Sequence, residues 1–181
     1  MNELKDFLGR ILTWPDSKCL ECKVSEHSIL VPGGLIYEDS LVSVYPELRV
    51  NMLSFIVVAP KRHVTSEDEL TEEERNRITD VITNVSKLLI KHGLCDDTYI
   101  HQRGVGYHLK YWVIGAYSPY LEREFSLNAF ETEDTMKRHG LPYTNAGKIM
   151  LMVQILKSDM KRWARKELSK KQTERDDREE R

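Results

Sequence analysis

The chain has 181 residues, of which 40% are hydrophobic and 31% are charged, and its 27 basic and 29 acidic residues leave a formal net charge of −2. This length fits one domain with room for appended elements. The near-neutral balance gives no global field that would favour nucleic acid or an anionic membrane as a partner. Residues 1–6 lack the pattern of a secretory signal, and the longest apolar stretch, residues 55–59, is too short to span a bilayer. Three cysteines, two of them in a Cys-x-x-Cys pair, fit a reducing compartment. We therefore expect a cytoplasmic protein with no membrane partner.

The N-terminal part of the chain shows one helical pattern followed by three strand patterns. Apolar residues recur at helical spacing over residues 3–12, which predicts a short amphipathic helix. Trp14-Pro15 ends it, because proline disfavours a helical conformation in the residue before it. A loop with Cys19 and Cys22 follows. The three predicted strands cover residues 35–37, 41–45 and 53–59, and the last of them is nearly all apolar.

Residues 71–92 carry the clearest helix pattern in the chain. Thr71 and Glu74 have the spacing of a capping box, in which the threonine side chain and the glutamate satisfy free N–H groups at the helix start. An apolar residue follows every three or four positions, and Gly93 is a natural C-terminal stop. This helix is expected to pack on the sheet.

The C-terminal half is predicted to add two strands and one long helix. The first of these strands begins at residue 98, and the second covers residues 107–114. Residues 116–145 have no clear period and predict an irregular arm, after which a helix is expected over residues 145–168 with a frayed, charged tail. The element order predicts an α+β fold with an antiparallel sheet of about five strands, divided into a domain over residues 1–115 and an extension over residues 116–181.

Four residues form a candidate metal site. Cys19 and Cys22 bring two thiolates together, while His63 lies just beyond a predicted strand and His108 lies early in another. Two sulfur and two nitrogen ligands suit tetrahedral zinc, and four protein ligands make such a site structural. A redox Cys-x-x-Cys motif and a chance pair of exposed cysteines are the alternatives.

Three segments resemble the N-terminal half of histidine-triad (HIT) proteins. These are residues 36–39 (Ile-Tyr-Glu-Asp), 57–64 (Val-Val-Ala-Pro-Lys-Arg-His-Val) and 70–74 (Leu-Thr-Glu-Glu-Glu). With the cysteine pair and the strand over residues 107–114, the resemblance covers roughly residues 18–115. It implies a nucleotide-binding sheet-and-helix fold, commonly a homodimer. Active members form a covalent nucleotidyl-histidine.

The resemblance also implies roles for individual residues. In zinc-containing members, including the galactose-1-phosphate uridylyltransferase branch, the positions that match the cysteine pair, His63 and His108 hold structural zinc. His108 matches the first histidine of the triad. The nucleophilic second histidine is replaced by Lys110 and the third by Trp112. A lysine ammonium has no lone pair with which to attack phosphorus, so the resemblance points to a degenerate triad.

The predicted ligand pocket has two interpretations. Trp112 can fill it while Lys110 reaches a carboxylate across its mouth. Alternatively, the pocket still binds a nucleotide or another phosphate, held by Glu47, Arg103, the Gly104 and Gly106 amides, Lys110 and Trp112. Lys110 is also the only candidate catalytic residue that we assign.

Three functional hypotheses follow. The first is a zinc-stabilised, catalytically degenerate HIT-like protein that binds a nucleotide, a phosphorylated small molecule or a protein. The second is an active nucleotide hydrolase or nucleotidyltransferase that uses Lys110 or another residue. The third is a scaffold that binds RNA or a protein through its C-terminal helix, although the net charge does not support nucleic acid.

Overall fold

The computed structural model describes residues 1–103, 107–116 and 144–179. The described strands form a five-stranded antiparallel sheet in the order β3-β4-β5-β7-β6 and a separate two-stranded sheet, β1-β2. The strands are β1 Asn2–Lys5, β2 Ile11–Trp14, β3 Tyr37–Glu38, β4 Val42–Pro46, β5 Phe55–Pro60, β6 Asp97–Arg103 and β7 Lys110–Ala116. The helices are α1 Leu20–Ser25, the 3₁₀ turn Glu67–Glu69, α2 Glu72–Lys91 and α4 Ala146–Glu179. The predicted α+β class and five-stranded sheet are confirmed.

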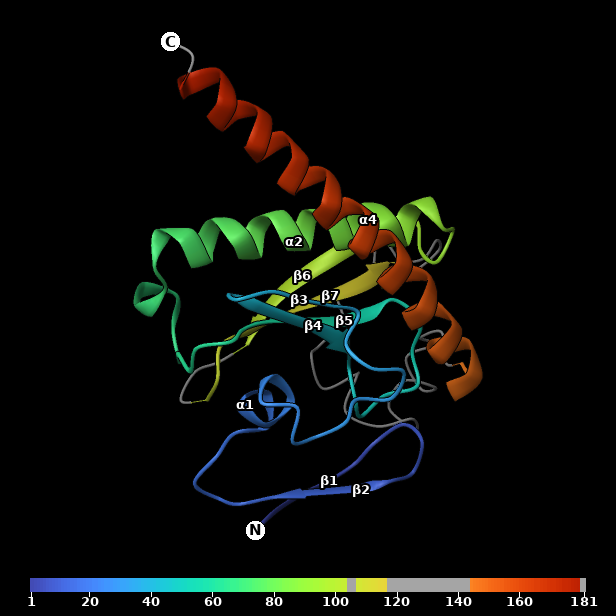
Figure 1. The fold of residues 1–181 in the computed structure, drawn as a ribbon. Coiled ribbons are helices and arrows are strands. Elements are labelled where there is room, and N and C mark those ends of the chain that lie inside the picture. Colours follow the sequence, from blue (N-terminus) through green and yellow to red (C-terminus); the bar gives the residue numbers. More distant parts are fainter. Residues whose placement is uncertain (104–106, 117–143, 180–181) are drawn as a thin grey trace.

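The sheet separates two hydrophobic cores. Helices α2 and α4 cover one face, whereas α1 and the β1-β2 hairpin lie on the opposite side (Figure 1). Side chains alternate along a strand, so β7 sends Tyr111 and Val113 into the helix-covered core and Trp112 and Ile114 into the other. The predicted triad positions therefore face α1 and the N-terminal segment.

Helix α2 has the predicted capping box. The Thr71 side chain accepts a hydrogen bond from the Glu74 backbone N–H at 3.1 Å, and the Glu74 carboxylate accepts one from the Thr71 N–H at 2.8 Å. Arg62 also binds Glu74, which lowers the pKa of that carboxyl to about 2. The arginine of the Pro-Lys-Arg-His block thus connects the end of β5 to the start of α2.

The helix predicted over residues 3–12 is wrong, because this segment is the β1-β2 hairpin. The Asp6 carboxylate accepts hydrogen bonds from the backbone N–H groups of Leu8 and Arg10, both at 2.9 Å. Gly9 has a φ of +80°, a conformation open to glycine at little cost. The aspartate and the glycine together favour a turn, and this local chemistry prevails over the helical spacing of the apolar residues.

Helix α4 begins one residue after the predicted start and continues to Glu179, beyond the predicted end at residue 168. Its first half is part of the helix-covered core, and Ile149, Met152 and Leu156 are among its fully buried residues. Trp163 is partly buried against this core, and the C-terminal part of the helix extends away from the sheet (Figure 1). The predicted irregular arm falls mostly on residues 117–143, outside the described residues. Within the described part of the chain, no helix combines the length and apolar character needed to cross a bilayer.

A buried carboxylate connects α4 to the C-terminal end of α2. The Asp159 side chain is 4% exposed, and its Oδ2 lies 2.8 Å from His92 Nε2 and 3.4 Å from Lys91 Nζ. Arg162 contacts the other oxygen. Hydrogen bonding to His92 is the main cause that lowers the pKa of Asp159 to about 2. The ionised form of Asp159 therefore stabilises the contact between the two helices.

We predict that Asp159→Asn destabilises the protein by about 1–2 kcal/mol at pH 7, because charge-assisted hydrogen bonds are lost. The folded-state pKa is lower than the unfolded one, so the ionised group stabilises the fold above about pH 4. This contribution disappears as the pH falls toward 2. Urea unfolding from pH 2 to pH 7 should show the two proteins converging at low pH. Asp80→Asn, at an exposed α2 position, is the control. A constant difference across the pH range would contradict the assignment.

Candidate metal centre beside the triad positions

The Cys-x-x-Cys pair lies at the start of helix α1 and not in a loop, as the sequence had suggested. Cys19 is the N-cap residue, and its sulfur accepts a hydrogen bond from the Cys22 backbone N–H at 3.3 Å. The first turn of the helix brings the two thiols to the same side. Both cysteines are partly exposed.

The two histidines reach the cysteines from the sheet. His63 follows β5, and His108 lies two residues before β7. The Cys19 sulfur lies 3.4 Å from His63 Nδ1 and 3.2 Å from His108 Nδ1, and the corresponding distances from the Cys22 sulfur are 3.4 and 3.5 Å. All four donor atoms lie within 4.8 Å of one another. The structure thus brings together all four residues of the predicted metal site.

These distances fit a zinc ion. Zinc–sulfur bonds of about 2.3 Å and zinc–nitrogen bonds of about 2.0–2.1 Å place sulfur and nitrogen ligands about 3.6 Å apart in a tetrahedron. The observed separations of 3.2–3.5 Å are within a few tenths of an ångström of that value. The donor set would hold zinc with no position left open for a reacting water.

The protonation chemistry of the ligands also fits a metal. Burial raises the pKa of the Cys19 thiol to about 12, so a metal must displace its proton to bind the thiolate. Burial lowers the pKa of His108, which favours the neutral imidazole. Its Nε2 lies 2.8 Å from the Pro60 carbonyl oxygen and can donate to it. That bond leaves the Nδ1 lone pair directed at the cysteines, as a metal ligand requires.

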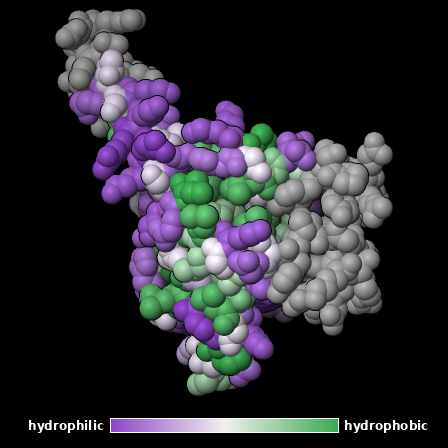
Figure 2. Space-filling view, turned by 90° about the vertical axis from the view of Figure 1, so that its right-hand side faces the viewer, coloured by the Kyte–Doolittle hydropathy of each residue, from purple (hydrophilic) through white to green (hydrophobic). Residues whose placement is uncertain are grey.

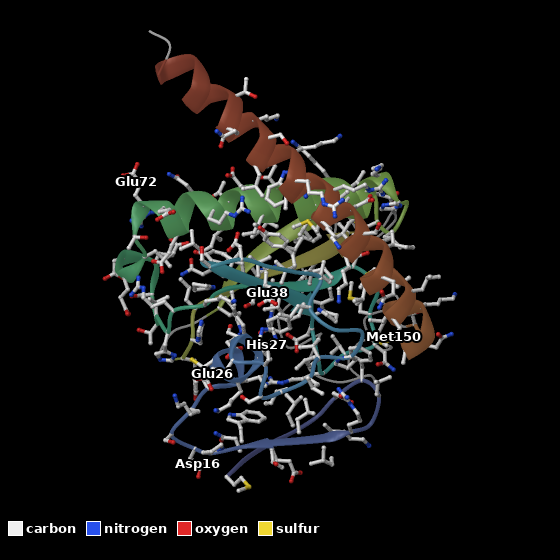
Figure 3. All side chains as sticks on the ribbon, in the orientation of Figure 1. Asp16, Glu26, His27, Glu38, Glu72 and Met150 are labelled. Carbon is white, nitrogen blue, oxygen red and sulfur yellow. The ribbon has the colours of Figure 1, made fainter. Side chains whose placement is uncertain are left out.

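Polar contacts at the end of α1 hold the helix on the sheet. Figure 3 shows His27, which lies two residues after α1, close to Glu38 on β3. His27 Nε2 lies 3.1 Å from a Glu38 carboxylate oxygen, and Lys61 Nζ lies 3.0 Å from the same oxygen. Lys61 is the second residue of the Pro-Lys-Arg-His block. The block therefore contributes a metal-type ligand, His63, and an ion pair with the Glu38 carboxylate that His27 also contacts.

Lys110 takes part in a buried ion pair. Its ammonium contacts the carboxylate of Glu21, and the two side chains are 18% and 6% exposed. Glu21 lies between the two cysteines on α1. A Zn²⁺ ion with two thiolates and two neutral imidazoles has no net charge, so such a site would not neutralise the nearby ammonium of Lys110. The carboxylate of Glu21 neutralises it instead. Lys110, the residue at the position of the triad nucleophile, is thus bound to a carboxylate.

Trp112 is a packed residue. It is 8% exposed and contacts Phe55 edge-to-face, with ring centroids 5.2 Å apart. The Arg103 guanidinium lies 4.8 Å from the centre of the indole ring. The indole Nε1 is buried, and no hydrogen-bond partner for it lies among the described residues. Trp112 stands at the position of the third triad histidine, so its indole fills the place on this face of the sheet where that histidine would lie.

Among the other predicted pocket residues, Arg103 lies beside the triad positions, whereas Glu47 has backbone partners of its own. Glu47 is buried and accepts hydrogen bonds from its neighbours' backbone, at 3.1 Å from the Leu48 N–H and 3.3 Å from the Arg49 N–H. Its carboxylate therefore closes a local turn. Gly104 and Gly106 lie outside the described residues. Arg103 pairs across the strands with Lys110, so these two are brought together on one edge of the site.

Glu21 is the site residue that the sequence did not reveal. It is separated from Lys110 by 89 positions, and its location inside the Cys-x-x-Cys pair does not indicate a buried carboxylate. Glu21 lies in the first turn of α1, but the sequence predicts a loop for this segment, so the position gave no indication that the side chain is buried. Tyr45 was missed as well. Burial raises its pKa well above the ordinary value, with further contributions from Glu21 and Glu47.

Comparison with solved structures finds HIT proteins. A zinc-bound histidine triad family protein from Mycobacterium smegmatis is 13% identical, with a TM-score of 0.60 over 83% of this chain and 98% of its own. A hypothetical histidine triad nucleotide-binding protein from Sulfolobus tokodaii is 17% identical, with a TM-score of 0.60 over 82% and 95%. A HIT-like protein involved in cell-cycle regulation from Bartonella henselae is 14% identical, with a TM-score of 0.59 over 81% and 98%.

No protein-family model matches the sequence. The identities are too low to transfer an activity, but the three structures each align over more than nine-tenths of their own length. The resemblance seen in the sequence is therefore confirmed at the level of the fold. This chain has the fold of the histidine-triad proteins.

Proposed function

We propose that the protein is a zinc-stabilised HIT-fold binding module without triad chemistry. The observation that supports this most directly is the ion pair between Lys110 and the buried carboxylate of Glu21. An ammonium bonded to a carboxylate has no lone pair to attack phosphorus. The residue at the nucleophile position thus serves to hold α1 on the sheet, beside the zinc ligands.

The packing of the same face supports a binding role at other surfaces. Trp112 and Ile114 of β7 belong to a core that also includes Leu20 and Val24 of α1 and Trp14 of β2. Apolar side chains therefore fill the region beside the triad positions. In this proposal zinc, α1 and this core form one structural unit, and partners bind elsewhere on the molecule.

Phosphate or nucleotide binding is the second candidate. Its support is Arg103, whose exposed guanidinium lies over Trp112 and beside Lys110 and has no carboxylate partner among the described residues. This candidate predicts thermal stabilisation by nucleoside monophosphate or inorganic phosphate that Arg103→Gln removes.

Homodimerisation, a cytoplasmic location and the division at residues 115/116 also remain proposals. Light scattering of the purified protein tests the homodimer.

Turnover assays test the absence of triad chemistry. We expect no release of nucleoside monophosphate from a dinucleoside polyphosphate or from a nucleoside phosphoramidate above the buffer rate, for the wild-type protein and for Lys110→Ala alike. The reason is that the Lys110 ammonium is paired with the Glu21 carboxylate. Release by the wild-type protein that Lys110→Ala abolishes would overturn the proposal and establish a lysine nucleophile.

A further inference from the structure

Two of the three cysteines are accessible at the surface. Cys19 and Cys22 are partly exposed, whereas Cys95 is buried. His63, which belongs to the same cluster as the first two, is exposed as well. The candidate metal centre therefore lies where small solutes can reach its sulfur atoms. Accessible thiolates are the sulfur groups that peroxides oxidise, and a second cysteine beside them resolves the product to a disulfide.

The two accessible sulfur atoms are close enough to pair with each other. Cys19 Sγ and Cys22 Sγ lie within 4.8 Å of each other. The Cys19 sulfur accepts a hydrogen bond from the Cys22 backbone N–H at 3.3 Å, so its side chain is already turned toward residue 22. A disulfide bond is about 2.05 Å long. Rotations at Cys19 can close the remaining distance, because this N-cap residue has non-helical backbone angles (φ −90°, ψ 160°).

The N-terminal layer, defined as residues 1–31, has little regular structure of its own. Helix α1 has six residues, and β1 and β2 form a sheet separate from the main one. A helix or a two-stranded hairpin of this size is marginal in water by itself. Figure 2 shows hydrophobic as well as hydrophilic residues on the outside of the lower end of the molecule, where the hairpin lies. The layer therefore depends on its contacts with the main sheet.

Three kinds of contact join α1 to that sheet. The cysteines meet the two histidines at the metal centre, and Glu21 pairs with Lys110. Leu20 and Val24 pack into the core on this face of the sheet. Glu21 lies between the cysteines in the sequence, so the metal centre and the ion pair act on the same helical turn. A chemical change at the cysteines is therefore transmitted to the position of α1.

We propose that Cys19 and Cys22 form a thiol–disulfide switch, which hydrogen peroxide oxidises and which then releases zinc and loosens α1 from the sheet. One thiolate sulfur attacks a peroxide oxygen and breaks the O–O bond, which gives a sulfenic acid and a hydroxide. The second thiolate attacks the sulfenic sulfur, so that the S–S bond forms and a second hydroxide leaves. Two electrons pass from the sulfur atoms to the peroxide, and two protons convert the hydroxides to water. The histidines alone then provide only half of the four ligands.

This inference rests on the zinc site of the proposed function and adds its regulation. The test uses the full chain with Cys95→Ala, so that every thiol belongs to the pair, loaded with zinc and treated with an excess of hydrogen peroxide. We expect two thiols to be lost for each zinc released, and the intact mass to fall by two hydrogen atoms. Dithiothreitol and added zinc should reverse both changes. The wild-type protein should respond in the same way and keep one thiol.

Trypsin cleavage measures the loosening of α1. Lys23 lies within this helix, and its side chain is 18% exposed. Cleavage of a folded protein follows the population of locally open states. After oxidation, cleavage at Lys23 should accelerate about tenfold more than cleavage at Lys87, the matched site within α2 on the other face of the sheet.

Each alternative outcome identifies what has failed. Zinc-loaded protein whose thiols and zinc resist peroxide would overturn the switch and leave the proposed function standing. Irreversible addition of oxygen atoms to the sulfurs, or a disulfide between two chains, would overturn it as well. Equal acceleration of cleavage in α1 and α2 would show general unfolding and contradict the loosening of α1. Protein that holds no zinc when purified without chelator would overturn the proposed function together with the switch.

Discussion

Cys19→Ser/Cys22→Ser should lose the bound zinc and much of the stability of the protein. Four donor atoms within 4.8 Å form a closed shell, and metal that binds only the folded state stabilises that state. At a free zinc concentration about a thousandfold above the dissociation constant, the stabilisation is about 4 kcal/mol. For a chain of this size this corresponds to a fall of roughly 10 °C in the melting temperature.

Metal analysis and thermal unfolding of protein purified without chelator would measure both effects. We expect about one zinc per chain in the wild-type protein. Chelator treatment should reproduce the lower melting temperature of the double variant, and it should leave that variant unchanged. Cys95→Ala is the matched control, because Cys95 is buried against Ser54 and Gly115, away from the site, and should keep its zinc. Full metal content in the double variant would refute the assignment.

The sequence predicted the parts of the fold that local chemistry determines. The capping box at Thr71 and Glu74 placed the start of α2, and the observed strand β5 ends at Pro60, one residue beyond the predicted strand over residues 53–59. The failure at residues 3–12 has a physical reason. Apolar spacing is shared by helices and by irregular hairpins, and the turn was decided by hydrogen bonds of Asp6 and by the backbone of Gly9.

The candidate site could be predicted only where a motif carried it. The four zinc-type ligands came from spacing and family resemblance, and the structure brings them together. The Glu21–Lys110 pair joins positions 89 residues apart, and neither residue signals its partner locally.

Glu21→Leu and Lys110→Met should each destabilise the protein by about 3 kcal/mol, because each leaves a buried charge without its partner. The double variant Glu21→Leu/Lys110→Met should recover most of this loss, since apolar residues of similar length replace both charges. Urea unfolding of the four proteins forms a double-mutant cycle, in which we expect an interaction energy above about 1 kcal/mol. Metal content, measured in parallel, separates loss of the pair from loss of zinc.

The pair Glu38–Lys61 is the matched control, because its side chains are 36% and 28% exposed and it joins β3 to the residue that follows β5. Its cycle should give less than about 1 kcal/mol, as solvent screens half-exposed charges. A stable, zinc-loaded Glu21→Leu/Lys110→Met protein would establish that Lys110 has a structural role. If Lys110→Met were as stable as the wild-type protein, the ion pair would not hold α1. The lysine would then be free for the chemistry that its position in the fold suggests, and the turnover assay would become decisive.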